Sequence, residues 1–450
     1  MSIKVGVTSL GCAKNLVDSE VILGYLRDGG LRVCDDLGDA QVIIVNTCAF
    51  LAEAEEEAGE TIRQLLEHKE RGAIERVVVA GCMPARRGAG CARKFPGVDR
   101  FIHPGEIPNV AGIVRVLVNG GDGKGPAPAE ERPEGWFLYD HLSPRVRLTP
   151  PHYAYLKVSE GCSNRCSYCL IPGIKGPLRS RECESVVEEA RSLAEEGVKE
   201  INLISQDTTA YGVDLFGESN LAELLKKLAG IEGLVWIRLL YGHPAHYADD
   251  VLSLIAREEK VCAYVDFPLQ HVSERLLASM NRRMTKKQVG ETLRKIRKII
   301  PGVTVRTTFI VGYPGETEGD FQELLDFVEE ARFEHLGAFM YSREKGTAAA
   351  RLPGQVSHKV KRERFHRLMT LQQGIVRKMN EAMVGKSVKV LVDEKLDAGQ
   401  FSLRGRTEGD APEVDGTVYI RGNCARTGEC VAVRITGVDD YDLVGEVLDV

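Results

Sequence analysis

The 450-residue sequence predicts an α/β protein in three parts: an N-terminal domain with a doubly wound parallel sheet, a central partial (β/α)6 barrel, and a small C-terminal all-β barrel. Short β-branched runs alternate with helical stretches over residues 1–118, and six further strand candidates alternate with amphipathic helices up to about residue 350. After residue 383 the pattern changes to short alternating strands separated by Gly and Asp. These three observations give the fold class.

The N-terminal domain, predicted over 1–118, contains three strand candidates that are apolar almost throughout. They are Lys4–Leu10, Val42–Asn46 and Val77–Ala80. Strands without polar alternation are typical of a parallel sheet covered on both faces. Residues 119–135 are rich in Gly, Pro and charge and have no apolar period, so we predict a linker over 119–147.

The central domain, predicted over 148–380, begins with the first of six strand candidates. They are Tyr153–Val158, Glu200–Ile204, Val235–Leu240, Ala263–Phe267, Val303–Val311 and Leu336–Tyr341. Successive βα units indicate a barrel or part of one, with its chemistry at the C-terminal ends of the strands. A long helical pattern over 355–383 ends this domain, and 381–450 forms the final module.

Charge and hydropathy exclude several classes of protein. The sequence has 59 Lys and Arg against 65 Asp and Glu, a formal net charge of −6. Non-specific electrostatic binding of nucleic acid by the whole protein is therefore not expected. No stretch approaches the ~18 apolar residues of a membrane helix, and the first residues lack the apolar core of a secretory signal. We therefore expect a cytoplasmic protein with no membrane partner. In that reducing compartment the 12 cysteines are more often metal ligands or buried thiols than disulfides.

Three cysteines stand close together at the start of the predicted barrel. Cys162, Cys166 and Cys169 form a CxxxCxxC pattern within GCSNRCSYC. Thiolates on so short a loop can converge on one metal centre, and soft sulfur ligands favour an iron–sulfur cluster or zinc. A structural zinc site normally uses a second CxxC or a His pair, and neither follows within the next thirty residues. We therefore favour a four-iron cluster in which one iron has no protein ligand.

Three other cysteines follow three predicted strands. Cys12, Cys48 and Cys82 each lie just past the C-terminal end of a strand candidate of the first domain. These ends share one edge in a doubly wound sheet, so the three thiols can meet there. The alternative is that each is a small buried hydrophobe, as a lone cysteine after a strand usually is. Three cysteines at equivalent positions after three strands favour a second cluster.

The CxxxCxxC pattern, with Tyr168 before its last cysteine, resembles that of the radical S-adenosylmethionine enzymes. In that family the open iron binds the amino and carboxylate groups of S-adenosylmethionine, and an electron from the cluster cleaves it to a 5′-deoxyadenosyl radical. With the second cysteine trio and the final module, nearly the whole chain resembles the methylthiotransferases. The resemblance implies an N-terminal domain with an auxiliary 4Fe-4S cluster, a radical S-adenosylmethionine barrel, and a C-terminal TRAM module, an OB-like barrel.

Two segments resemble one branch of that family. LGCAKNLVDSE around Cys12 and IPGIKGPLRSR after Cys169 are similar to the RimO branch, which modifies a ribosomal protein, rather than to the tRNA-modifying MiaB branch. The resemblance implies that a sulfur species on the auxiliary cluster is methylated by one S-adenosylmethionine. A second molecule then yields the radical that removes hydrogen from the substrate. The expected product is a methylthio group on the β-carbon of an aspartate in ribosomal protein uS12.

Five further residues are weaker candidates for cofactor binding. Tyr168 is expected near the adenosine, with a plain core contact as the alternative. Ser205 and Gln206, followed by Asp207, close the second strand, where these polar groups could hold the methionine moiety or ribose, or form a simple loop. Gly312 in VGYPGET would let a flat base approach the backbone, or serve a Gly/Pro turn. Arg306 could neutralise a carboxylate, although a structural ion pair is the commoner role.

Charge also suggests the substrate. Residues 383–450 contain eight basic and thirteen acidic side chains, so this module would repel a phosphate backbone and attract a basic protein such as uS12. The basic helical stretch 355–383 is an exception that could contact RNA, or be a solvated face. The implied partners are uS12, the ribosome and an electron donor such as flavodoxin or ferredoxin.

Two alternatives remain at this point. The first is a MiaB-like tRNA methylthiotransferase with the same chemistry, for which tRNA would be the partner. The second is a non-catalytic iron–sulfur electron carrier. The carrier is disfavoured because carriers usually complete each cluster with four protein ligands, whereas each constellation here supplies three.

Overall fold

The computed structural model describes residues 2–34, 36–120, 137–422 and 425–448. Its contacts divide the chain into two compact units. The first comprises 1–149, 155–164 and 169–189, and the second comprises 150–154, 165–168 and 190–450. Most of the predicted linker 119–147 lies outside the described residues, and its described part from 137 contains no helix or strand.

The first unit contains a five-stranded parallel sheet in the order β2-β1-β3-β4-β5. The strands are β1 (Lys4–Ser9), β2 (Arg32–Val33), β3 (Val42–Thr47), β4 (Arg76–Gly81) and β5 (Arg100–Phe101). The three strands expected from the sequence are confirmed. The other two have only two residues each, too few to produce an apolar pattern.

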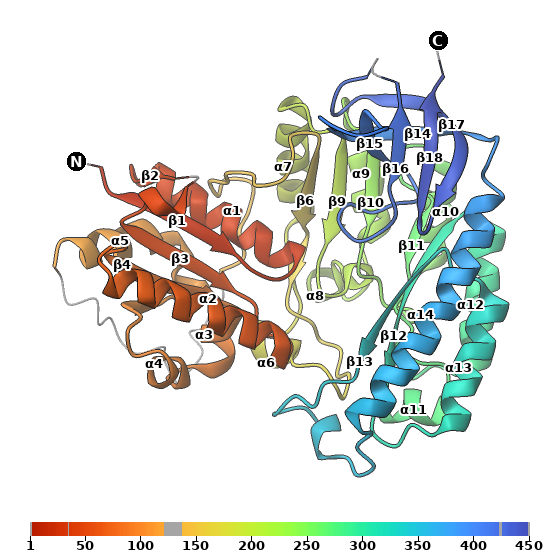
Figure 1. The fold of residues 1–450 in the computed structure, drawn as a ribbon, viewed down its shortest axis with the longest axis horizontal. Helices are drawn as coiled ribbons and strands as arrows, with labels where there is room; N and C mark the ends of the chain where they lie inside the picture. The colour runs from red at the N-terminus through yellow and green to blue at the C-terminus, as the bar shows by residue number, and fades with distance from the viewer. Residues whose placement is uncertain (1, 35, 121–136, 423–424, 449–450) are drawn as a thin grey trace. The chain divides into compact units, whose positions relative to one another are not determined.

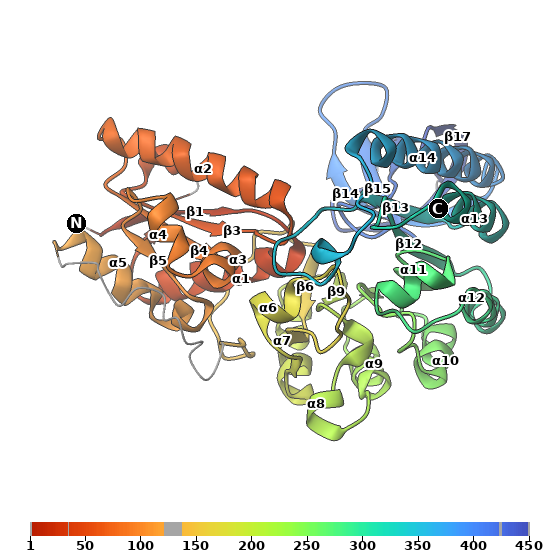
Figure 2. The same cartoon turned by 90° about the horizontal axis from the view of Figure 1, so that it is seen from below.

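Helices cover both faces of this sheet, as a doubly wound fold requires. Helices α1 (Ala13–Asp28) and α5 (Val110–Val118) pack against each other on one face, and α2 (Ala52–Glu70) lies over the other (Figure 2). The short helices α3 (Cys82–Arg87) and α4 (Gly90–Lys94) follow β4. All six residues of β3 are buried, because this strand lies at the centre of the sheet.

The central strands form two three-stranded parallel sheets, in the orders β10-β9-β6 and β11-β12-β13. The strands are β6 (Tyr153–Lys157), β9 (Glu200–Ile204), β10 (Trp236–Leu239), β11 (Tyr264–Asp266), β12 (Thr304–Val311) and β13 (His335–Met340). A parallel bridge between Ile237 and Val261 links the two sheets. The six expected strands and the partial barrel are therefore confirmed (Figure 1).

Helices alternate with these strands in the βα pattern. They include α7 (Cys183–Glu195), α9 (Leu221–Ala229), α10 (Asp249–Arg257), α12 (Lys286–Ile299), α13 (Glu318–Ala331) and the long α14 (His358–Glu381). Within the described part of the chain, none of the helices has the length and apolar character that a membrane span requires.

The C-terminal strands close into a five-stranded barrel in the order β14-β15-β16-β18-β17. They are β14 (Ser387–Lys395), β15 (Leu403–Thr407), β16 (Val418–Arg421), β17 (Cys430–Asp439) and β18 (Asp442–Val447). Aliphatic side chains such as Val390, Val418 and Val433 fill its interior. The predicted all-β module is confirmed.

A buried ion network joins this small barrel to the central strands. Glu200, the first residue of β9, is fully buried and contacts Arg238 of β10, with 3.0 Å between Oε1 and Nε. Its Oε2 lies 2.7 Å from Nη2 of Arg406 on β15, which also pairs with Asp393 at 2.8 Å. Burial alone would raise the pKa of Glu200, but the two guanidinium groups outweigh it and lower that pKa. The module thus closes the N-terminal end of the strands.

A second set of polar contacts attaches the same module at β12 and β13. Arg306 Nε donates to Asp415 Oδ1 at 3.1 Å, and Tyr264 Oη donates to Asp415 Oδ2 at 2.7 Å. His335, the first residue of β13, lies between Asp410 and Asp415, with its Nε2 3.4 Å from an Asp410 oxygen. Burial opposes protonation of His335, but the carboxylates outweigh it and raise its pKa to about 9.

This histidine predicts a pH dependence of folding stability. Because the folded pKa of about 9 exceeds the usual value of 6.5, the folded state binds the proton more tightly. The stabilisation from His335 is therefore complete below pH 6.5 and is lost as the pH rises through 9. We expect urea denaturation midpoints to fall over this interval in the wild type and to fall less in His335→Gln. His366→Gln, an exposed histidine on α14, is the control. Equal pH slopes for wild type and His335→Gln would contradict the prediction.

Candidate metal centres

Three cysteines of the first unit lie at one edge of its sheet. Cys12 follows β1 and precedes α1, Cys48 follows β3, and Cys82 follows β4 as the first residue of α3. Since β1, β3 and β4 are adjacent and parallel, their C-terminal ends share this edge. Gly11 has a φ of +98°, and a Cβ there would lie 2.5 Å from the Cβ of Cys48. Only glycine therefore lets the loop of Cys12 approach Cys48 this closely.

Two buried asparagines fix this edge. Asn15 Nδ2 donates to the carbonyls of Leu10 and Asn46, at 2.6 and 3.1 Å. Asn46 Nδ2 donates in return to the Asn15 carbonyl at 2.9 Å and to Ser19 Oγ at 2.8 Å. These reciprocal bonds hold the loop of Cys12 against the end of β3. The sequence analysis missed them, although an asparagine ending an apolar strand was a usable signal.

The electrostatics show that the three thiols are neighbours. Burial is the main effect that raises the pKa of Cys82 to about 12; Lys175 opposes the rise, and charges on Cys48 and Cys12 contribute to it. Burial also raises the pKa of Cys48, and a charge on Cys12 adds to that effect. Three thiolates would therefore repel one another at this edge unless a cationic group lay between them. A metal centre would provide that group.

The donor set fits a polynuclear iron–sulfur group better than a single zinc ion. The ligands of a four-iron cluster bind different irons and lie further apart than those of one tetrahedral ion. Three neighbouring thiols are soft sulfur donors, and three of them on a four-iron cluster would leave one iron open.

Buried charges lie near Cys82. Helix α6 (Ile171–Lys175) packs against α3, and its Lys175 has Nζ 3.2 Å from Asp18 Oδ2 and 3.4 Å from Glu160 Oε2. Lys157 pairs with the same two carboxylates, at 2.8 Å from Glu160. Burial opposes a charge on Lys175, but these carboxylates outweigh it and raise its pKa. Lys175 therefore carries a permanent positive charge near Cys82, which the sequence analysis did not identify.

The second trio lies in the loop between β7 (Ser159–Glu160) and α6. Cys162 N donates to the Gly176 carbonyl at 3.1 Å, and Cys169 Sγ accepts from the Ile171 amide at 3.4 Å. The loop passes through both units, since Cys166 belongs to the second and the other two to the first. At most three residues lie between consecutive cysteines, so the chain keeps the Cα atoms of each consecutive pair within about 14 Å.

Family models match all three parts of this chain. The Radical SAM superfamily matches residues 156–328, the Uncharacterized protein family UPF0004 matches 4–103, and the TRAM domain matches 384–448. The chain is 47% identical over 449 residues to the ribosomal protein uS12 methylthiotransferase RimO of Heliobacterium modesticaldum, covering 100% of this chain and 96% of the relative. It is 46% identical to that of Pelotomaculum thermopropionicum, with 99% of each chain covered. The chain belongs to the RimO family.

Solved structures outside the RimO family share the fold. The radical S-adenosylmethionine methyltransferase TsrM from Kitasatospora setae, with cobalamin and a [4Fe-4S] cluster bound, superposes with a TM-score of 0.56 at 18% identity, covering 78% of this chain and 77% of that one. The cobalamin-dependent S-adenosylmethionine radical enzyme OxsB gives a TM-score of 0.51 at 14% identity, with 83% and 56% covered. At these identities the likeness concerns the fold alone.

Tyr168 and the pair after β9 lie in the second unit of this RimO family member. Tyr168 packs against the apolar cluster that contains Met280 and Tyr313, and its Oη accepts from Arg282 Nε at 3.3 Å. Ser205 is buried, and its Oγ accepts from the Asp207 amide at 3.0 Å. Gln206 follows it and is half-buried. All three lie past the C-terminal ends of barrel strands or on the cysteine loop, as predicted, and their cofactor roles remain predictions.

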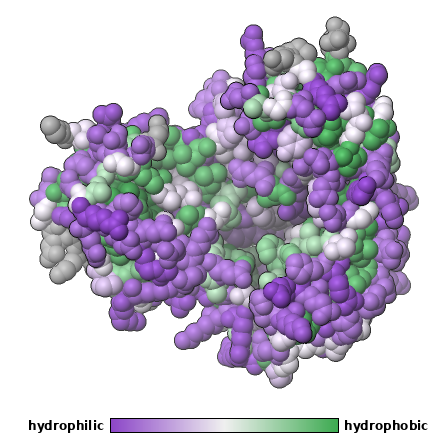
Figure 3. All heavy atoms as spheres, viewed as in Figure 1, coloured by the Kyte–Doolittle hydropathy of each residue, from purple (hydrophilic) through white to green (hydrophobic). Residues whose placement is uncertain are grey.

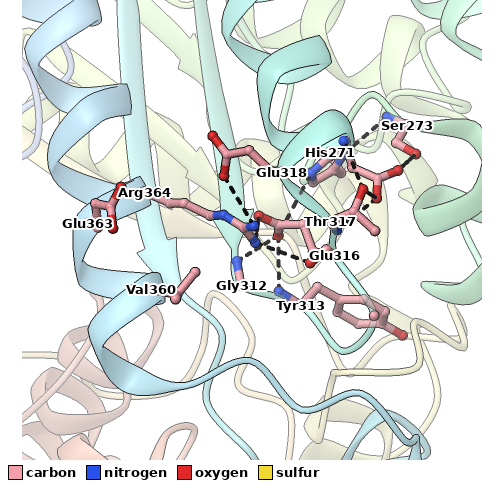
Figure 4. A network of polar contacts seen from close by, with 12 residues as sticks. His271, Ser273, Gly312, Tyr313, Glu316, Thr317, Glu318, Val360, Glu363 and Arg364 are labelled. Carbon is pink, nitrogen blue, oxygen red and sulfur yellow. Dashed lines mark hydrogen bonds and ion pairs between the residues drawn. The ribbon is translucent and has the colours of Figure 1, made fainter.

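Gly312 lies in a buried polar network at the end of β12 (Figure 4). Glu316 Oε2 accepts from the amides of Gly312 and Tyr313, at 2.6 and 3.1 Å, and Oε1 accepts from Arg364 Nη1 at 2.9 Å. Gly312 has a φ of +73°, and a Cβ there would lie 2.3 Å from Lys361 Cγ. The packing of α14 thus accounts for this glycine without a flat base against the backbone.

Arg306 does not lie with the other predicted site residues. It is the third residue of β12, near the N-terminal end of the strand, whereas the cysteine loop and Gly312 follow C-terminal ends. Its Nε pairs with Asp415 of the C-terminal barrel. This ion pair favours the alternative of a structural role for Arg306, and binding of the cofactor by this residue remains a prediction.

Asp207, which the sequence places beside Ser205 and Gln206, has a histidine partner that was not predicted. Asp207 Oδ2 lies 2.9 Å from Nδ1 of His246, whose ring stacks on His243 at a centroid distance of 4.4 Å. Burial lowers the pKa of His243 to about 3, with Arg282 adding to the effect, so that ring is neutral. His246 comes from the loop after β10, nearly forty residues further along the chain. No local spacing in the sequence could have indicated this pair.

Proposed function

We infer that this chain is a methylthiotransferase that acts on ribosomal protein uS12 with two 4Fe-4S clusters and S-adenosylmethionine. The observation that carries this conclusion is the gathering of three thiols at one sheet edge in a chain that matches RimO relatives over its full length. The finer proposal is that the methylthio group is added to the β-carbon of an aspartate of uS12, in the cytoplasm, with electrons from a flavodoxin or ferredoxin.

We assign the two clusters to the two cysteine trios. Cys12, Cys48 and Cys82 would hold the auxiliary cluster, because their thiols are mutual neighbours at the sheet edge. The other three, Cys162, Cys166 and Cys169, would hold the cluster that binds S-adenosylmethionine, because their loop opens the barrel within the Radical SAM match. When bound, the clusters and S-adenosylmethionine supply the removal of hydrogen from the substrate carbon and the methylthio group that replaces it.

The side chains of this protein contribute by fixing the positions of the loops around the proposed clusters. The hydrogen bonds between Asn15 and Asn46 fix the loop of Cys12 relative to the strand of Cys48. The bonds that Glu316 accepts from Gly312, Tyr313 and Arg364 fix the turn after β12. Such fixed elements hold reacting groups at short separation, which is the main contribution a protein makes when its cofactors supply the chemistry.

The proposed function predicts a specific change in mass. Anaerobically reconstituted protein, incubated with reductant, S-adenosylmethionine and purified uS12, is expected to add about 46 Da to uS12, the mass of a methylthio group replacing hydrogen. Fragmentation of the product should place the added mass on an aspartate. A parallel reaction with tRNA serves as the control. A mass gain on tRNA but none on uS12 would overturn the proposal.

A further inference from the structure

The loop after β13 forms a cationic groove. The groove has a volume of about 520 Å³ and is lined by Arg343, Lys345, Gly346, Thr347, Ala350 and Arg351. It follows the C-terminal end of the last barrel strand, in the loop drawn in cyan in Figure 1. Hydrophilic side chains cover most of this end of the unit (Figure 3). Three of its six lining residues are therefore permanent cations on a hydrophilic surface.

Two of these cations are available to a partner. Lys345 and Arg351 are exposed, and neither has an ion pair with any residue that the structure describes. Arg343 is also exposed and donates from Nε to the Ala350 carbonyl at 2.8 Å, which leaves its charge unneutralised. The acid of this segment, Glu344, is 2% exposed and accepts from Ser342 Oγ at 2.7 Å. The groove is therefore positive where solvent reaches it.

The first turns of α14, which follow this loop along the chain, carry two further exposed cations. Lys359 and Arg362 are exposed, three residues apart and so on one face of the helix, and have no ion pair among the described residues. Other cations of the helix have structural partners: Lys361 donates to the Tyr341 carbonyl at 2.6 Å, and Arg364 pairs with Glu316. The basic residues at the start of α14 thus fall into two classes: Lys359 and Arg362 have no ion pair among the described residues, whereas Lys361 and Arg364 hold the helix in place.

We propose that the groove, together with Lys359 and Arg362, binds the phosphate backbone of RNA. This rests on the proposed function, since a ribosomal substrate consists of basic protein and RNA, and the RNA backbone offers a regular array of phosphate anions to five unneutralised cations. Exposed Lys and Arg that neutralise phosphates release counterions and supply most non-specific RNA affinity. The groove would hold the enzyme on ribosomal RNA while uS12 reaches the C-terminal edge of the strands.

The proposal is tested first by binding alone. We expect the full-length protein to bind a fluorescein-labelled single-stranded oligouridylate in an anisotropy titration, with an affinity that falls as NaCl rises. The variant Lys345→Ala/Arg351→Ala should lose about tenfold or more in affinity near 50 mM NaCl. Its slope of log affinity against log salt should be smaller by about 1.4, because two phosphate contacts on a single strand are lost.

The control is Arg377→Ala/Lys378→Ala, at the far end of α14, where Lys378 lies nineteen residues or about 28 Å beyond Lys359. Both of these cations are exposed, and Arg377 pairs with Glu381 at 3.1 Å. This double variant should change the affinity less than twofold. Equal losses in both double variants, or an unchanged salt slope in the groove variant, would overturn the proposal. So would tighter binding of a polyglutamate peptide than of the oligouridylate, which would indicate an acidic protein partner instead.

A second measurement relates the groove to the substrate. The rate of methylthiolation on intact small ribosomal subunits is divided by the rate on isolated uS12, and we expect this ratio to fall about tenfold in Lys345→Ala/Arg351→Ala. An unchanged ratio would contradict the proposal. If no methylthiolation occurs on either substrate, the proposed function fails, and the anisotropy titration still decides whether the groove binds RNA.

Discussion

Replacing Cys48 with alanine is expected to lower the iron content of anaerobically purified protein from about eight to about four atoms per chain, because one of two four-iron clusters loses a ligand. Methylthiolation of uS12 should be abolished. Reductive cleavage of S-adenosylmethionine should continue, since Cys162, Cys166 and Cys169 remain. Iron analysis and product chromatography measure both effects. The same pattern is expected for Cys12→Ala and Cys82→Ala, because all three thiols share one edge.

The matched control for these variants is Cys91→Ala. Cys91 is a buried thiol of the same unit, whose Sγ lies 3.5 Å from the Met83 carbonyl within an apolar cluster. Its loss should cost packing energy but no iron. Full iron content in Cys48→Ala, or an equal loss of iron in Cys91→Ala, would contradict the assignment of the auxiliary cluster to these cysteines.

The variant Glu200→Ala is expected to lower the free energy of unfolding by about 3–5 kcal/mol, because it leaves the buried charges of Arg238 and Arg406 without their shared partner. Urea denaturation followed by circular dichroism measures this loss. Glu394→Ala removes the partner of Arg404 from a pair whose side chains are about half exposed, and should cost less than about 1 kcal/mol. Equal denaturation midpoints for the two variants would contradict a structural role for the buried network.

Much of the fold and of the metal centres follows from local sequence. Apolar runs indicated the long strands, and the place of each cysteine relative to its strand indicated which thiols would meet, because parallel strands end at one edge. Gly312 and Arg306 show where this reasoning stops. The conformation at Gly312 is explained by Lys361, which comes from a helix almost fifty residues later. The role of Arg306 depends on which end of β12 faces the final module, and a strand pattern does not contain that information.

The charge of the final module is a second limit of sequence reasoning. A count of its side chains gives an excess of acids, but Asp393 pairs with Arg406, Asp415 with Arg306, and Asp410 lies near His335. These carboxylates are therefore neutralised within the protein. The excess of acids thus overstates the attraction of the module for a basic substrate, because a composition cannot show which charges face solvent.

The ion network at the N-terminal end of the strands restricts how such enzymes can be recombined. Arg406 and Asp415 belong to the final barrel, while Glu200 and Arg306 belong to the central strands, so two ion pairs cross from one part to the other. A chimaera whose last sixty or so residues came from an unrelated protein would bury charges without ion-pair partners, unless that protein supplied equivalent groups. Exchange of this module between distant relatives therefore requires matching substitutions on both sides of the interface between the final barrel and the central strands.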